Sequence, residues 1–153
     1  MVLLVVLAGQ ATVQGVDTYM GLVHPPLPVG CKSNGGGLLD DAGTISFQDV
    51  SCTEARMFWL QQLVDRKNLR WRVIDILVIP ALPEDRAVAQ MHDGCLYADN
   101  PQAEVVAIAQ WLPDSHSGFE GEIYQAWVLN PELKRIQEVS PKKVACGHTE
   151  DRN

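Results

Sequence analysis

The sequence is short of basic residues. It has 12 Lys and Arg against 19 Asp and Glu, which gives a formal net charge of −7 at pH 7. Nucleic acids and anionic membrane surfaces bind through clustered Lys and Arg, because these side chains neutralise phosphates. The densest basic stretch, at 66–72, is interrupted and too small to outweigh the acidic residues. The composition therefore argues against nucleic acid as a partner.

Long apolar runs are missing too. A transmembrane helix needs about 18 or more apolar residues in a row, and the chain has no such stretch, so no membrane span is expected. Residues 1–8 are nevertheless almost wholly apolar, and the small residues Gly9 and Ala11 follow. This order is typical of the end of a secretory signal peptide, although no Lys or Arg precedes the run. We expect residues 1–11 to be the remnant of a signal peptide; the alternative is a buried N-terminal β-strand.

The motifs of common enzymes are also absent. The chain has no G-x-S-x-G turn, the sequence that carries the nucleophile of many hydrolases. Its glycines at 35–37 follow Lys32 and Ser33, whereas a phosphate loop ends in Gly-Lys-Ser/Thr. Asp, Ser and His stand together at 114–116, but catalytic triads are built from elements that converge in space. A small hydrolase with an unrecognised site stays an alternative, and no cofactor is expected.

The cysteines include no C-x-x-C pair, but four are present: Cys31, Cys52, Cys95 and Cys146. An even number of well-spread cysteines is typical of disulfides in an oxidising compartment. Three pairings are possible. We favour Cys31 with Cys52, which closes a short loop, and Cys95 with Cys146, which ties the tail to the body. The protein is then extracytoplasmic, either periplasmic or secreted; the alternative is four reduced thiols in the cytosol.

A zinc site is a second hypothesis for the same residues. His92 and Cys95 form an H-x-x-C pair, and Cys146 and His148 form a C-x-H pair. Imidazole nitrogen and thiolate sulfur are ligands that zinc prefers. Both the zinc site and a disulfide between Cys95 and Cys146 require the tail to return beside residues 92–95. The two hypotheses therefore share one geometry and differ in chemistry.

One helix is predicted, over residues 52–67. Ser51 and Glu54 have the spacing of a capping box, in which each side chain accepts a hydrogen bond from the other residue's backbone N–H. Asn68 is a suitable stop. The apolar residues of the segment form a broad face at helical spacing; they are Cys52, Ala55, Phe58, Trp59, Leu60, Leu63 and Val64.

The rest of the chain predicts short strands. Residues 24–43 are rich in Pro and Gly and are expected to form a loop, and Pro83 to start a helical turn over 84–90. The strands are expected at 44–50, 70–79, 95–98, 104–112, 122–129, 135–139 and 144–146. Short connections favour antiparallel pairing. We therefore predict an α+β fold: a three- to five-stranded antiparallel sheet with one main helix, 52–67, on one face, in a single globular domain over 12–153.

Asp75 is the candidate ligand-binding residue. It interrupts the apolar strand 70–79, and strict alternation places it on one face with Trp71, Val73 and Leu77. A buried carboxylate needs a partner or a raised pKa. The functional interpretation is an acid–base or ligand-fixing group in an apolar pocket. The alternative is a structural carboxylate at a sheet edge or beside an Arg.

Tryptophans are the remaining candidates for a binding surface. The four, at 59, 71, 111 and 127, are expected to pack in the core; the alternative is an exposed aromatic platform for a carbohydrate or a peptide. No catalytic residue is identified. The sequence therefore favours an exported, disulfide-stabilised protein that acts by binding a protein partner or a small ligand rather than by catalysis.

Overall fold

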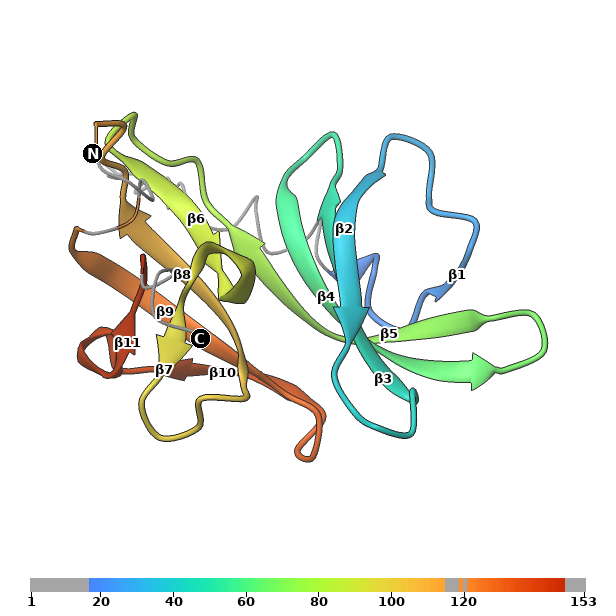
Figure 1. Ribbon diagram of the computed structural model, residues 1–153. Helices are drawn as coiled ribbons and strands as arrows, with labels where there is room; N and C mark the ends of the chain where they lie inside the picture. The colour runs from blue at the N-terminus through green and yellow to red at the C-terminus, as the bar shows by residue number, and fades with distance from the viewer. Residues whose placement is uncertain (1–16, 115–118, 120, 148–153) are drawn as a thin grey trace, which may run out of the picture.

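The computed structural model describes residues 17–114, 119 and 121–147, in which the chain forms three antiparallel β-sheets (Figure 1). The first sheet has the spatial order β1-β5-β4-β3-β2 and curls into a half-barrel. Its strands are β1 Val23–His24, β2 Lys32–Leu38, β3 Ile45–Ser51, β4 Arg56–Asp65 and β5 Arg70–Ile79. The segment predicted to be an export signal, 1–11, lies outside the described residues.

The second sheet has the order β10-β9-β8-β6, and β11 pairs with β7 in a small third sheet. These strands are β6 Arg86–Gln90, β7 Leu96–Tyr97, β8 Glu104–Gln110, β9 Ile123–Asn130, β10 Arg135–Val139 and β11 Val144–Ala145. Two 3₁₀ helices, η1 Met91–Asp93 and η2 Pro141–Lys143, connect them. Within the described ranges, no helix has the length and hydropathy that a membrane span requires.

The α+β prediction is wrong, because the described residues form an all-β structure and 52–67 contains β4 instead of a helix. This strand lies in the middle of the half-barrel and is buried on both faces. Met57 and Trp59 point to one face, whereas Phe58 and Leu60 point to the other. A strand buried on both faces reads as a continuous apolar run, and such a run does not distinguish a strand from a buried helix.

Two further segments differ from the sequence expectation. The predicted helical turn at 84–90 is β6, which starts after a turn closed by the bond from Arg86 N to Pro83 O. The predicted loop at 24–43 contains β2, whose seven residues are all exposed. Because β2 is an edge strand with no buried side chain, it lacks the apolar alternation by which strands are detected.

The core between the sheets joins the convex face of the half-barrel to the second sheet. Phe58 and Leu60 of β4 and Leu77 of β5 pack there with Val106 of β8 and Leu129 of β9. Burying a side chain of this size stabilises a fold by about 1.5–3 kcal/mol. This shared core fixes the convex face against a neighbour and leaves the concave face of the half-barrel available.

A second core lies on the opposite face of the four-stranded sheet, under β7 and β11. It is rich in alanine, including Ala89, Ala107 and Ala126, so the covering segments can approach the sheet closely. Cys95 and Cys146 lie in this core and form a disulfide bond, and a second bond joins Cys31 to Cys52. The structure thus contains two disulfide bonds, in the pairing that the sequence favoured.

Candidate functional site

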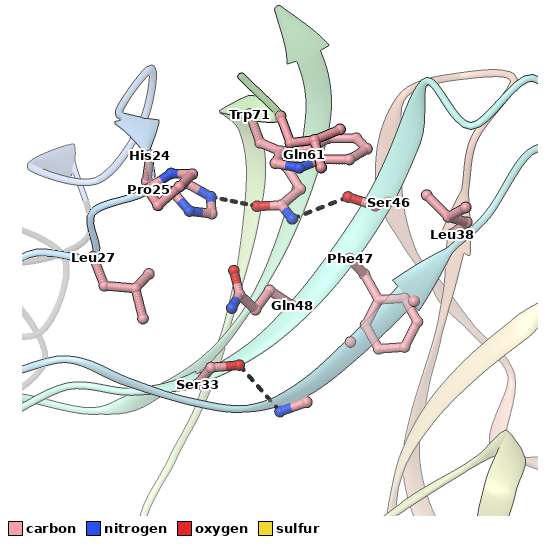
Figure 2. A pocket seen from close by; sticks show the side chains of 14 residues that line it. His24, Pro25, Leu27, Ser33, Leu38, Ser46, Phe47, Gln48, Gln61 and Trp71 are labelled. Atoms are coloured by element: carbon pink, nitrogen blue, oxygen red, sulfur yellow. Dashed lines mark hydrogen bonds between the residues drawn. The ribbon is translucent and has the colours of Figure 1, made fainter. Parts of the chain in front are cut away.

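A hollow of about 560 Å³ lies in the concave face of the half-barrel (Figure 2). All five strands contribute to its wall. Its volume is within the range of pockets that hold small ligands, about 300–1,000 Å³. The lining residues with polar side chains are His24, Ser33, Ser46, Gln48 and Gln61; the apolar ones are Pro25, Leu27, Leu38, Phe47, Leu69 and Trp71, together with the glycines at 35–37.

The strand register explains why the polar residues meet. Residues opposite each other in an antiparallel pair share a face of the sheet. Ser46 of β3 lies opposite Gln61 of β4, and His24 of β1 lies opposite Trp71 of β5. Gln48 lies opposite Trp59, which is on the same face of β4 as Gln61. The concave face is therefore reached from four strands: by Ser46 and Gln48 of β3, Gln61 of β4, His24 of β1 and Trp71 of β5.

A chain of hydrogen bonds crosses the wall of the hollow. The ring of His24 donates from Nε2 to Gln61 Oε1 over 2.5 Å, and Gln61 Nε2 donates to Ser46 Oγ over 2.9 Å (Figure 2). All three residues are buried. Because the Gln61 oxygen accepts, His24 carries its proton on Nε2 when neutral, and Nδ1 keeps a lone pair. The hydroxyl proton of Ser46 stays free to donate to another group.

His24 is held as a neutral imidazole. Burial lowers its pKa below the ordinary value of 6.5, and the hydrogen bond with Gln61 opposes this effect. The ring meets the indole of Trp59 edge-on, with 5.5 Å between the ring centroids. Burial disfavours the charged form because an imidazolium loses its water there. The hydrogen-bond chain thus carries no charge at neutral pH.

The closed end of the half-barrel supports the hollow. Tyr19, Trp59 and Val73 form an apolar cluster there, with the disulfide between Cys31 and Cys52 packed against it. The hydroxyl of Tyr19 donates to Glu54 Oε2 over 3.0 Å. Burial, followed by the hydrogen bond and the charge of Glu54, raises the pKa of Tyr19. This end of the barrel is therefore filled, and the hollow occupies the other end.

Two features of the wall indicate what it can bind. No Asp, Glu, Lys or Arg is among the described residues that line the hollow, although the whole chain is acidic. The amide of Gln48 has no hydrogen-bond partner within the described chain, so it offers both donors and an acceptor. A charged ligand would lose its hydration without finding an opposite charge. The site suits an uncharged ligand that combines apolar surface with a hydrogen-bonding oxygen or amide.

A second hollow, of about 360 Å³, lies near the start of β8 and the end of β9. Its polar groups have structural roles. Asn130 accepts from the backbone of Leu133 and donates to Gln137. Glu104 accepts a hydrogen bond from the backbone of Met91, and burial raises the pKa of its carboxyl. The polar groups of this second hollow therefore hold turns and strand ends. The concave hollow, whose Gln48 amide is free, is the stronger candidate for a binding site.

Asp75, the ligand candidate from the sequence, lies outside the concave hollow. An extra residue in β5 between the partners of Leu60 and Gln61 makes a bulge, and this bulge reverses the alternation. Val73 consequently packs in the cluster at the closed end, whereas Leu77 packs between the sheets. Asp75 accepts hydrogen bonds from the backbone N–H groups of Ile76 and Ile136. Its carboxylate thus has structural partners.

The zinc ligands predicted from the sequence are only partly described. Cys95 and Cys146 are joined by a disulfide of 2.08 Å, and in that state neither sulfur is a thiolate. His92 is exposed beside Asp93, and His148 lies outside the described residues. Among the described residues, no group of three or more His, Cys, Asp or Glu is arranged to hold a metal ion. Residues 115–116 of the polar loop considered for hydrolysis also lie outside the described ranges.

Sequence reasoning missed the residues of the concave hollow. Two signals pointed to them: Gln61 interrupts the apolar run of β4, and the glycines at 35–37 mark a strand without side chains. Of the tryptophans, Trp59 is fully buried, and Trp71 is half-buried in the wall of the hollow. Comparisons of the chain with family models, with curated proteins and with solved structures found no match, so the site has to be interpreted from its own geometry.

Proposed function

We propose that the protein is an exported, disulfide-stabilised binding protein that holds an uncharged ligand in the concave hollow of the half-barrel. The observation that carries the proposal is the uncharged wall, built on the buried chain of His24, Gln61 and Ser46. A buried polar chain of this kind costs free energy unless its members are satisfied, and here it orients a free hydroxyl and leaves the Gln48 amide available.

Binding is favoured over catalysis by the order in which the three residues are hydrogen-bonded. Ser46 and His24 are separated by Gln61, and Ser46 Oγ accepts from an amide N–H. A carboxamide cannot take a proton from a serine hydroxyl, so the base that a serine nucleophile needs is not in contact with it. All four cysteines are in disulfides, so no thiol nucleophile is present.

Export is supported by the two disulfides, because such bonds persist in oxidising compartments. The apolar start of the sequence supports it independently. The test is the mass of the native protein recovered from outside the cytoplasm: each disulfide removes two hydrogens. A protein that starts at Met1 and carries four free thiols would contradict export.

The binding proposal is tested by tryptophan fluorescence, since Trp71 lines the hollow and Trp59 packs against His24 of its wall. The probes are three neutral classes: methyl glycosides, N-acetyl amino-acid amides and medium-chain alcohols. We expect saturable binding of at least one class, weakened about tenfold or more by Gln48→Ala and Trp71→Ala, a loss of about 1.4 kcal/mol or more. Gln125→Ala, at an exposed position of β9, is the matched control. Binding that neither pocket variant weakens would rule out this site.

A further inference from the structure

The free edge of β2 borders the concave hollow. β2 is the last strand of its sheet, and no other described strand pairs with its outer side. Leu39 N donates to Ile45 O over 2.9 Å, just beyond the end of β2. In an antiparallel ladder, hydrogen-bonded and non-hydrogen-bonded pairs alternate. Because Leu39 and Ile45 form a hydrogen-bonded pair, the pairs of Leu38 with Ser46 and of Gly36 with Gln48 are non-hydrogen-bonded. The N–H and C=O groups of Gly36 and Leu38 therefore point away from β3.

This edge carries little of the protection that exposed strands usually have. Charged residues, prolines and bulges prevent other strands from pairing with an edge. In β2 these are confined to Lys32 and to the irregularity between Ser33 and Gly35. From Gly36 to Leu38 no bulge, charge or proline intervenes, and Leu38 is 64% exposed. The glycine at 36 is required by the fold, because a Cβ there would lie 2.2 Å from the carbonyl oxygen of Phe47.

The same residues belong to the wall of the hollow. Gly36 and Leu38 line it from one edge of the half-barrel, and His24 and Pro25 line it from the other. A strand added to β2 would therefore lie across the opening of the half-barrel. Its side chains alternate between two faces, so every second one would enter the hollow. The wall there has no charge, and the segment that fits it is uncharged as well.

We infer that the ligand is an extended, uncharged peptide segment of a partner protein, which docks on the outer edge of β2 as an added strand and places alternate side chains in the concave hollow. This inference rests on the proposed function, because it names the class of ligand for the same site. The backbone of the segment hydrogen-bonds to Gly36 and Leu38, and its inward side chains contact Trp71 and the free amide of Gln48.

The experiment uses the wild-type chain and a displayed library of random uncharged nonapeptides. The most enriched peptide is synthesised and then methylated at one backbone nitrogen at a time. We expect methylation to weaken binding at least tenfold at every second position in its central part and to have little effect between them, because only alternate N–H groups face β2. Hydrogen exchange should show new protection of the amides of Gly36 and Leu38 on peptide binding.

Leu38→Pro is the matched variant of the protein. It removes an outward N–H without removing a bond to β3, and proline is tolerated at such edge positions. We expect the variant to unfold at the same urea concentration as the wild type and to bind the peptide at least tenfold more weakly. If the variant fails to fold, the methylation series on the wild-type chain decides the question alone.

The other outcomes separate this inference from the proposed function. Peptide binding that requires Trp71 and Gln48 but tolerates methylation throughout would overturn strand addition and leave the concave site in place. The same holds if no peptide is enriched while a neutral small molecule binds. A wild-type dimer that Leu38→Pro dissociates would show that a second copy occupies the edge, which also overturns the inference. If neither peptides nor small molecules bind at the site, both proposals are wrong.

Discussion

The carboxylate of Asp75 accepts a hydrogen bond from the backbone N–H of Ile136 over 2.6 Å, and this bond joins β5 of the half-barrel to β10 of the second sheet. Its other oxygen accepts from the N–H of Ile76 over 2.9 Å. The bulge in β5 places the carboxylate next to the core between the sheets. One side chain thus satisfies two backbone donors, one of which belongs to the other sheet.

Replacing Asp75 should therefore loosen the contact between the sheets. Asp75→Ala leaves two backbone N–H groups without their acceptor, and we expect the free energy of unfolding in urea to fall by about 2–3 kcal/mol. Asp75→Asn keeps one acceptor oxygen and should lose less. Asp41→Ala, at an exposed position, is the control. Equal stabilities for the Asp75→Ala and Asp41→Ala variants would contradict a structural role for this carboxylate.

The glycines of β2 should differ sharply in their tolerance of a methyl group. In Gly36→Ala the new Cβ meets backbone atoms of β3, at 2.2 Å from Phe47 O and 3.2 Å from Gln48 Cα, so β2 has to move away. In Gly37→Ala it meets only the ring of Phe47, at 3.3 Å, and a side chain can adjust. We expect Gly36→Ala to cost roughly 1–3 kcal/mol and Gly37→Ala less than about 1 kcal/mol. Thermal or urea unfolding measures both, and the reverse order would contradict the close approach of β2 to β3.

The two disulfides should contribute unequally to stability. Cys31 and Cys52 are 21 residues apart in the sequence, whereas Cys95 and Cys146 are 51 apart. Restricting the unfolded chain stabilises by about 3 kcal/mol for the first loop and about 4 kcal/mol for the second. The double variant Cys95→Ala/Cys146→Ala should therefore unfold at a lower urea concentration than Cys31→Ala/Cys52→Ala. A larger loss from the shorter loop would show that the local packing around Tyr19 outweighs loop entropy.

The strands on the two sides of the core between the sheets were predictable, whereas the central strand was not. β5 and β10 have the bounds that the sequence indicates, because β-branched residues and turn residues mark them. β4 was mistaken for a helix because its run from Met57 to Leu60 is apolar on both faces, and Ser51 and Glu54 stand at capping-box spacing. In the structure Glu54 accepts from the Tyr19 hydroxyl instead. Only the tertiary pairing with β3 and β5 decides between the two conformations.

The candidate site was hidden for a related reason. Its polar residues are far apart in the sequence: His24, Ser46 and Gln61 meet only because β1, β3 and β4 bring them to one concave face. Their spacing in the sequence does not show that these three residues meet. The disulfide pairing agrees with the sequence preference, which rested on a short loop for Cys31 with Cys52 and on a link from the C-terminal tail to the rest of the domain for Cys95 with Cys146. The site, in contrast, depends on the register of several strands. The bulge in β5 is equally invisible in the sequence, and it moved Asp75 away from the face that strict alternation assigned.

Acidification should destabilise the fold through His24. Burial lowers the pKa of His24 below 6.5, its value in an unfolded chain. As the pH falls below 6.5, the unfolded chain takes up a proton before the folded protein does, so the equilibrium shifts toward unfolding. The stability associated with neutral His24 is therefore complete above pH 6.5 and is lost as the pH falls toward the lowered pKa.

Two measurements check this pH dependence. The ring protons of His24 should titrate by NMR with a midpoint below 6.5. The free energy of unfolding should fall between pH 7 and pH 5 more steeply in the wild type than in His24→Gln, where the titrating group is gone. Burial raises the pKa of Glu104, so protonation of this carboxyl increases the free energy of unfolding as the pH falls, opposite to the effect of His24. Only the difference between wild type and His24→Gln therefore isolates the contribution of His24. His92→Gln, at a side chain that is 70% exposed, is the control and should keep the contribution of His24. A His24 midpoint at or above 6.5 would mean that water reaches the ring, and the neutral hydrogen-bond chain on which the concave site depends would then not exist.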